Sequence, residues 1–170
     1  MQVLDAIDRA AIDRLRTAGE YFWLDLVDPS QDALDEMCGL FGVGELVAED
    51  LRERGQRPKL DDYDSYVHGV FYGVDGDELV EVHFVIHGDA VITVRPARCA
   101  ALAGVRARVA QVDPTREEQA IYLVLDALTD SFFPLLERMA DEIDDIEDRI
   151  VSAGGRHAPA LQAFAARRRR

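Results

Sequence analysis

The sequence is poor in the features that mark several classes of protein. Its 170 residues include two cysteines, Cys38 and Cys99, which lie far apart and lack the spacing of metal ligands. We therefore expect buried thiols in a reducing compartment rather than a disulfide framework. Acidic residues outnumber basic ones by 33 to 19, and the resulting net charge of -14 argues against a nucleic-acid partner. Long hydrophobic runs are missing too: Asp126 and Asp130 interrupt the most apolar window, residues 121–136, so we expect no membrane span in this chain.

Targeting and catalytic signals are also missing. Asp5 and Asp8 interrupt the opening residues, so we predict no secretory signal. The Gly42-Val43-Gly44 run lacks a third glycine and follows no expected strand, so it is not a nucleotide-binding fingerprint. The sequence contains no Walker loop and no Gly-x-Ser-x-Gly elbow. Because no acid/base pair stands on convergent elements, we predict that the chain is not an enzyme, and a metal-dependent hydrolase built on its acids and histidines is a remote alternative.

The patterns that are present predict an α+β fold with three layers, α/β/α, around a mixed and largely antiparallel sheet. Hydrophobic and charged contents of 48% and 31% fit a soluble globular protein, and the length suits one domain with an appendage. Helices are expected over residues 4–15, 30–41, 45–54 and 97–112, and strands over 21–27, 58–63, 66–74, 78–87 and 90–95. We expect Asp28 to cap the second helix, and turns at Asp75-Gly76 and Gly88-Asp89. The domain would cover residues 1–111, and a helical hairpin would cover residues 112–170.

Residues 115–151 predict one long helix. Thr115 is the expected N-cap, and the apolar positions that follow have nearly the 3.5-residue period of a coiled coil. Pro134 should bend this helix rather than end it, because the period continues through it. A Gly154-Gly155 turn and a last helical piece, residues 160–170, follow. That piece ends uncapped in four arginines, from which we expect the natural chain to continue beyond Arg170; a natural basic tail is the alternative.

Two sets of side chains could ligate a metal ion. His83 and His87 lie four residues apart on an expected strand, too far to share an ion unaided, so we expect two partly exposed imidazoles on one sheet face. The carboxylates are more informative. Asp141, Asp144, Asp145 and Asp148 form a stripe along the long helix, and Glu49-Asp50 adds a second acidic spot. Hard cations such as Mg²⁺ bind through a few carboxylates with retained waters, although such residues also serve only to keep a helix soluble.

Several motifs, taken in order, resemble the CorA family of divalent-cation transport proteins. The run Trp23-Leu24-Asp25-Leu26 with Asp28-Pro29-Ser30 resembles the family's W-I-D-L-x-D-P-T opening. Further matches are Leu40-Phe41-Gly42, Leu46 to Leu51 with its Glu49-Asp50 pair, Gln56-Arg57-Pro58-Lys59, Leu125 to Pro134, and Asp141 to Glu147. The resemblance covers residues 21–152, and the order of the motifs makes it specific.

The resemblance implies a cytoplasmic regulatory domain of a pentameric transporter. Mg²⁺ held between neighbouring subunits would stabilise the closed channel, and the positions that match the sensor carboxylates are Glu49, Asp50, Asp141 and, more loosely, Asp144. Other subunits of a homo-oligomer would be the partners, at the cytoplasmic face of the cell membrane. The family's Gly-Met-Asn motif, stalk helix and two membrane helices have no counterpart in this sequence. We therefore expect a fragment that does not itself transport ions.

Two further hypotheses stay open at this point. The chain could be a free-standing cytosolic α/β module whose helical hairpin mediates protein association without metal. It could also be the same domain of a zinc-transporting relative, because ion selectivity, whether for Mg²⁺, Co²⁺ or Zn²⁺, resides largely in the pore.

Overall fold

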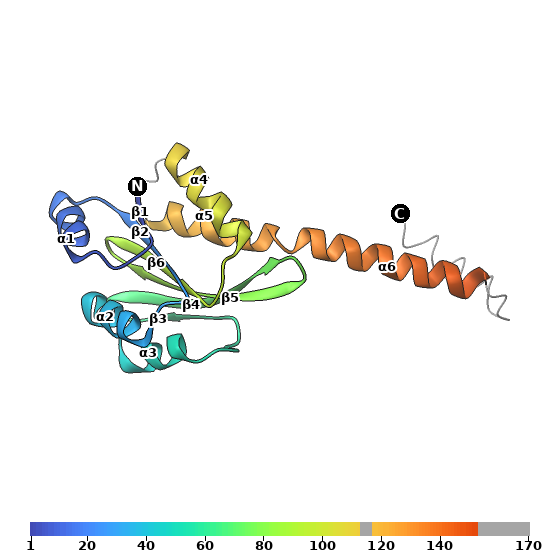
Figure 1. Cartoon of the computed structure of the whole chain (residues 1–170), viewed down its shortest axis with the longest axis horizontal. Coiled ribbons are helices and arrows are strands. Elements are labelled where there is room, and N and C mark those ends of the chain that lie inside the picture. The colour runs from blue at the N-terminus through green and yellow to red at the C-terminus, as the bar shows by residue number, and fades with distance from the viewer. Residues whose placement is uncertain (113–116, 153–170) are drawn as a thin grey trace. The chain divides into compact units, whose positions relative to one another are not determined.

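A computed structural model describes residues 1–112 and 117–152 of the chain. The elements in order are β1 (Gln2–Leu4), α1 (Arg9–Ala18), β2 (Phe22–Val27), α2 (Gln31–Phe41), α3 (Glu45–Arg52), β3 (Lys59–Asp62), β4 (Tyr66–Asp75), β5 (Glu78–His87), β6 (Ala90–Arg95), α4 (Ala100–Val112), α5 (Glu117–Asp130) and α6 (Phe133–Ser152) (Figure 1). The chain divides into two compact units, Met1–Ser131 and Phe132–Arg170, and each is described by itself.

The first unit is built on a mixed sheet with the strand order β1-β2-β6-β5-β4-β3. The β1–β2 and β2–β6 pairs are parallel, whereas the β6–β5, β5–β4 and β4–β3 pairs are antiparallel. Tight turns explain the antiparallel half: Gly76 lies at a φ of 65° between β4 and β5, where an L side chain would be strained. The predicted fold class is therefore confirmed for this unit.

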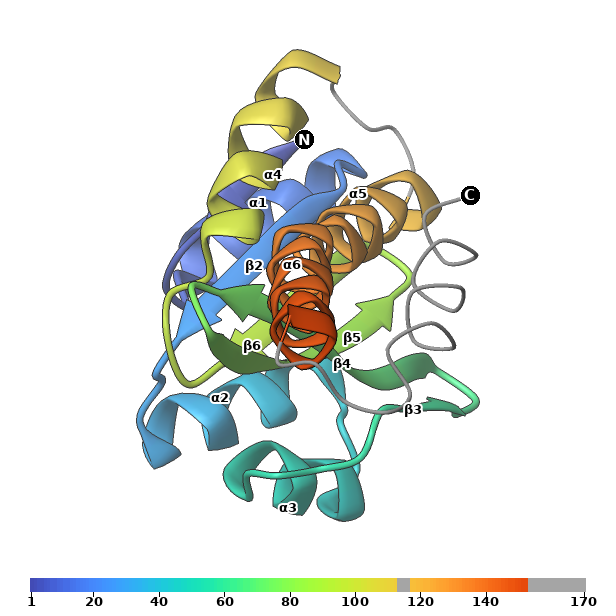
Figure 2. The ribbon, with the colours of Figure 1, turned by 90° about the vertical axis from the view of Figure 1, so that its right-hand side faces the viewer.

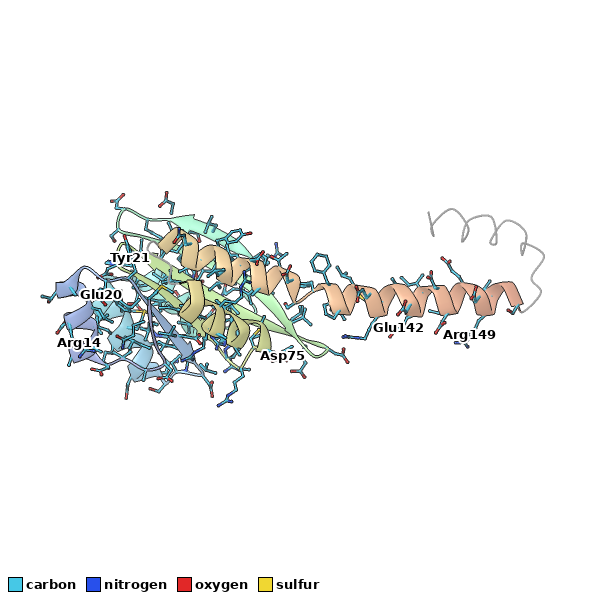
Figure 3. All side chains as sticks on the ribbon, turned by 90° about the horizontal axis from the view of Figure 1, so that it is seen from above. Arg14, Glu20, Tyr21, Asp75, Glu142 and Arg149 are labelled. Atoms are coloured by element: carbon cyan, nitrogen blue, oxygen red, sulfur yellow. The ribbon has the colours of Figure 1, made fainter. Side chains whose placement is uncertain are left out.

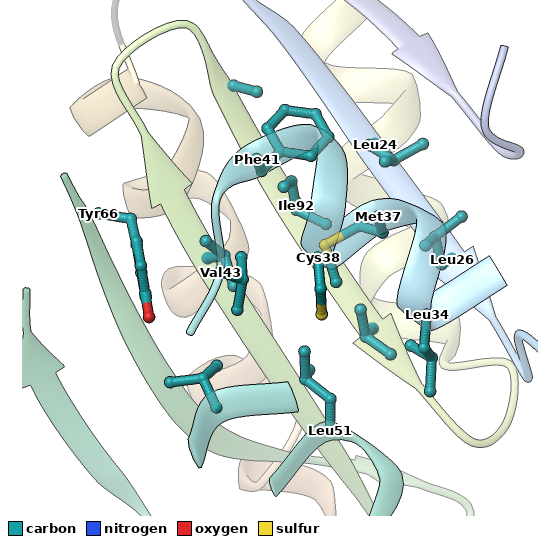
Figure 4. Packing of buried hydrophobic residues seen from close by; sticks show 14 of the residues in the cluster. Leu24, Leu26, Leu34, Met37, Cys38, Phe41, Val43, Leu51, Tyr66 and Ile92 are labelled. Atoms are coloured by element: carbon teal, nitrogen blue, oxygen red, sulfur yellow. The ribbon is translucent and has the colours of Figure 1, made fainter. Parts of the chain in front are cut away.

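Helices cover both faces of the sheet and enclose two apolar clusters. One cluster lies between the sheet and α1, α2 and α3, and Figure 4 shows part of it, with Phe41 and Met37 of α2 near Ile92 of the sheet. The other lies between the sheet and α4 with α5, which Figure 2 shows together on the opposite face. β2 contributes side chains to both clusters, because Leu24 faces the first cluster and Trp23 faces the second. Cys38 and Cys99 are buried free thiols, as predicted.

Two predictions near the N-terminus were wrong. Residues 4–15 are not one helix, because Leu4 belongs to β1, which pairs in parallel with β2, and α1 begins only after Asp8 caps it. Asp28 is not the cap of α2. Its N–H donates to the Arg95 carbonyl at 2.8 Å as a continuation of the strand pairing, and its φ is 46°. The cap is Ser30, whose hydroxyl accepts from the Ala33 N–H.

The single long helix predicted over residues 115–151 is interrupted. α5 ends at Asp130, and a turn at Ser131 and Phe132 precedes α6, which has Pro134 as its second residue. A proline is tolerated there, where its missing N–H is not needed, but it opposes helical geometry just before it. Ser131 fixes the end of α5, since its hydroxyl accepts from the Val74 N–H at 2.8 Å and donates to the Leu128 carbonyl at 2.5 Å. Thr115 and the residues expected to form the hairpin's second arm lie outside the described residues.

One helical stretch, Gln119–Ile150, is long and apolar enough to cross a membrane by length and composition, contrary to the prediction that none would be. Its α5 portion is a core helix of the first unit: Ala120, Val124 and Leu128 are buried against the sheet. Its α6 portion carries acidic residues beside half-exposed apolar ones, as in Figure 3, where Glu142 projects from the helix. Only 22% of the qualifying window is buried, so the burial of α5 accounts for part of its apolar composition.

Candidate functional site

The Glu49-Asp50 pair lies on α3, and the burial of that helix decides where each carboxylate points. Val47, Ala48 and Leu51 are buried against the sheet. This leaves Glu49 exposed and Asp50 at the edge of the buried face, half-buried. The loop after α3 then leads into β3, an edge strand of the sheet.

A basic side chain from β3 already contacts Asp50. The Lys59 ammonium lies 2.5 Å from Asp50 Oδ2 and 3.5 Å from Asp61 Oδ2, so it bridges carboxylates of two elements. The exposed fractions of the side chains are 32% for Lys59, 22% for Asp50 and 44% for Asp61. The hydrogen bond to Asp50 raises the pKa of Lys59, which keeps the amine protonated. Water reaches this pair, so its charges are only partly desolvated.

A buried carboxylate, Glu81, holds the loop between α3 and β3. The backbone N–H groups of Gly55 and Gln56 donate to it at 2.6 and 3.2 Å, and the Tyr72 hydroxyl donates to the Gln56 carbonyl at 2.6 Å. Burial alone would raise the pKa of Glu81, but the Gly55 N–H, the His83 imidazole and the Gln56 N–H together lower it. Glu81 therefore stays ionised and fixes the segment that connects Asp50 to Lys59.

His83 and His68 extend this buried network beneath the site. His83 Nε2 lies 2.8 Å from Glu81 Oε1, and His83 Nδ1 lies 3.3 Å from His68 Nε2. Burial, reinforced by His83, lowers the pKa of His68 to about 4, and burial also lowers the pKa of His83. The pattern assigns both imidazoles as neutral, with His83 donating to Glu81 and His68 donating to His83.

The histidine prediction was therefore wrong for His83, which is 4% exposed. His83 lies on β5, a central strand between β4 and β6, and the sheet face that carries it is covered. The sequence alone did not reveal that β5 is central. His87 is half-buried and lies 3.0 Å from Asp89. Within residues 1–112 and 117–152, no three His, Cys, Asp or Glu side chains are grouped so that they could hold a metal ion. Neither acidic spot is a complete metal site by itself.

The carboxylates Asp141 and Asp144 belong to the second unit. They lie on α6, with Asp141 exposed and Asp144 half-buried. Six apolar residues of the same helix are at least 39% exposed: Phe133, Leu136, Met139, Ile143, Ile146 and Ile150. The predicted acidic stripe and apolar seam therefore both occur on this helix. Assignment of Glu49, Asp50, Asp141 and Asp144 as metal ligands stays a prediction.

A second charged network, which the sequence did not reveal, explains the Trp-Leu-Asp-Leu run. Asp25 is fully buried and is bound by both terminal guanidinium nitrogens of Arg95. The Thr93 hydroxyl donates to Asp25 at 2.7 Å, and Trp23 Nε1 donates to Thr93 at 2.8 Å. Arg106 of α4 adds a contact of 3.2 Å to Asp25. The only sequence signal was an aspartate inside an apolar strand, and the network locks α4 to the sheet rather than forming an open site.

Comparison with known proteins decides the family. The family model for the CorA-like Mg²⁺ transporter protein matches residues 18–170. The chain belongs to this family. It is 30% identical over 142 residues to the magnesium transporter ALR1 of Saccharomyces cerevisiae, covering 78% of this chain and 16% of that protein. It is 28% identical over 130 residues to the cobalt/magnesium transport protein CorA of Thermotoga maritima, covering 71% and 37%. The chain thus spans well under half of either relative.

Solved structures confirm the fold of this CorA-like chain. The soluble domain of CorA from Methanocaldococcus jannaschii superposes with a TM-score of 0.58 at 17% identity, covering 85% of this chain and 61% of that one. The cytoplasmic domain of ZntB from Vibrio parahaemolyticus gives a TM-score of 0.63 at 14% identity, with 72% and 53% covered. At such identities the likeness establishes the architecture, which is that of CorA-type soluble domains.

Proposed function

We propose that this chain is the cytoplasmic, metal-sensing part of a CorA-like divalent-cation transporter, at the cytoplasmic face of the cell membrane and within a homo-oligomer. The observation that carries the proposal is the family match over residues 18–170, which includes the stretches with Glu49, Asp50, Asp141 and Asp144. These four carboxylates are the proposed Mg²⁺ ligands. The relatives' names point to transport rather than catalysis.

The charge of the chain supplies the physical logic of such a sensor. With a net charge of -14, copies of the chain repel one another, most strongly where carboxylates face each other. A divalent ion shared across the contact offsets that repulsion and favours the assembled state. Because neither acidic spot brings three ligating side chains together, sharing between subunits is what the proposal requires.

Sedimentation velocity of the chain in EDTA and then in millimolar Mg²⁺ tests the proposal. We expect Mg²⁺ to shift the distribution to larger species, and Asp50→Ala or Asp141→Ala to abolish the shift. Asp13→Ala is the matched control, because it removes one exposed carboxylate from α1. A distribution that Mg²⁺ leaves unchanged, or a shift that all three variants retain, would contradict the proposed ligands. Parallel runs with Co²⁺ and Zn²⁺ rank the three ions by the size of the shift in sedimentation that each produces.

A further inference from the structure

The chain contains a single lysine, and it lies on a proposed metal ligand. Eighteen of the 19 basic residues are arginines, and the exception is Lys59. Its ammonium is the group 2.5 Å from Asp50. Other carboxylates of this unit pair with arginines: Arg95 binds Asp25 and Arg16 binds Asp89. Among the pairs between a lysine or arginine and a carboxylate in the described part of this unit, the pairs made by Lys59 are the ones that use an ammonium instead of a guanidinium.

Arginine and lysine side chains bind a carboxylate in different ways. A guanidinium presents a rigid fork that can hold both oxygens of a carboxylate, whereas an ammonium is a compact point charge on a flexible stem. A divalent ion that approaches Asp50 must displace its counter-ion or share the carboxylate with it. A lysine yields more readily than an arginine, since it makes fewer directional bonds to the carboxylate.

Lys59 also has a second acceptor within reach. Asp61 Oδ2 lies 3.5 Å from its ammonium, and Asp61 is the more exposed of the two carboxylates. Asp61 stands two residues along β3, on the same face of the strand as Lys59. An ammonium released from Asp50 can therefore move to Asp61 without leaving the site or disturbing the strand. Glu81 keeps the α3–β3 loop in place while it does so.

We propose that Lys59 is a built-in, displaceable counter-ion that occupies Asp50 when no divalent ion is bound and moves toward Asp61 when one binds. It neutralises Asp50 in the empty state, so it lowers the affinity of that carboxylate for the metal and sets the concentration at which the ion is sensed. This inference rests on the proposed function, in which Asp50 is a Mg²⁺ ligand.

Two substitutions of Lys59 with opposite expected effects on Mg²⁺ affinity test the inference in the 170-residue chain. Lys59→Met removes the charge and keeps the apolar stem, and should tighten Mg²⁺ binding, measured by isothermal titration calorimetry, about three- to tenfold. Lys59→Arg keeps the charge and adds the fork, and should weaken binding. Arg9→Met, on α1, removes one positive charge from a residue paired with Glu36 and should leave the affinity unchanged. In an Asp50→Asn background the Lys59 substitutions should have no effect.

A second readout follows the lysine itself. Because the sequence has one lysine, ¹³C-lysine labelling gives one side-chain spin system in an NMR spectrum. We expect its Cε–Hε cross-peak to shift with the same Mg²⁺ midpoint as the binding isotherm, and to stay still in Asp50→Asn. If Asp50→Asn leaves wild-type affinity unchanged, the proposed function loses this ligand and the inference falls with it. If Asp50 matters but the Lys59 variants bind Mg²⁺ alike, or the cross-peak does not move, the inference alone is overturned.

Discussion

Asp25 and Asp50 are both carboxylates held by a basic side chain in the same unit, yet their surroundings are opposite. Asp25 is fully buried and is contacted by Arg95, Arg106 and Thr93. Asp50 is 22% exposed, and its contact is the ammonium of Lys59. Both residues fall in motifs that resemble CorA-type sequences. Burial and the kind of cation, rather than the presence of an aspartate, therefore separate a structural carboxylate from one open to a metal ion.

Removing the charge of each carboxylate should give the largest contrast between them. Asp25→Asn leaves the buried Arg95 without its counter-ion, and removes one of the two carboxylates near the partly exposed Arg106, so we expect a loss of about 3–5 kcal/mol in the free energy of unfolding. Asp50→Asn should cost less than about 1 kcal/mol, because its partner is solvated. Urea denaturation followed by circular dichroism measures both. Equal losses would show that the two environments do not differ in the way the structure indicates.

The Asp50 region should also respond to acid, because the buried imidazole of His68 interacts electrostatically with Asp50 and Lys59. The unfolded His68 side chain binds a proton below about pH 6.5, but the buried one does so only below about 4. Unfolding therefore takes up a proton between these values, and the free energy of unfolding falls as the pH is lowered from 6.5 to 4, by about 3 kcal/mol for His68. The groups in electrostatic range of His68 are His83, Lys59, Asp50 and Asp61.

Thermal unfolding between pH 4 and 7 measures this slope. His68→Gln should flatten it whatever its effect on stability at pH 7, and His83, whose pKa is also lowered by burial, should account for slope that remains. Glu81 acts at the lower end: its folded pKa is depressed, so its stabilising effect is present above its unfolded pKa and is lost as the pH falls below that value. A slope that is identical in His68→Gln and wild type would contradict the buried neutral imidazole.

The sequence could predict the elements that are determined by neighbouring residues, but not those that depend on residues far away in the sequence. Local signals were sufficient for the span of α2, which ends at Phe41 before Gly42, although not for its N-cap, and for the β5–β6 hairpin. They failed for β1, whose three residues form a strand only because β2 lies beside them. They failed again at Ser131, where a hydrogen bond to Val74, distant in sequence, fixes the end of α5.

The same limit applied to the candidate site. The sequence placed Glu49 and Asp50 on a short helix, which the structure confirms, but gave no sign that Lys59 reaches Asp50. The burial of His68 and His83 needed the register of β4 and β5 and the loop held by Glu81. Asp25 stood out only as a polar residue in an apolar strand, and its arginine partners lie 70 and 81 positions away in the sequence.

Exchanging arginine for lysine, or lysine for arginine, beside each carboxylate should change the free energy of unfolding by a smaller amount. Arg95→Lys keeps the charge but loses one of the two bonds to Asp25 in a buried site, and we expect a loss of about 1–3 kcal/mol. Lys59→Arg should change the free energy of unfolding by less than about 0.5 kcal/mol, because water solvates either cation there. Urea denaturation of the two variants at one pH provides the test. A large loss in Lys59→Arg would mean that the Asp50 site is as sterically closed as the Asp25 site.

The smallest expected effect concerns salt. Double-mutant cycles in urea give the coupling free energy of Asp50 with Lys59, using Asp50→Asn and Lys59→Met, and that of Asp25 with Arg95, using Asp25→Asn and Arg95→Met. The first should be about 0.5 kcal/mol at low ionic strength and vanish near 1 M NaCl, where the Debye length is about 3 Å. The second should persist, since mobile ions do not enter a buried pair. A salt-resistant Asp50–Lys59 coupling would mean that the ammonium is held too firmly for a divalent ion to displace it, and would count against Lys59 as an exchangeable counter-ion.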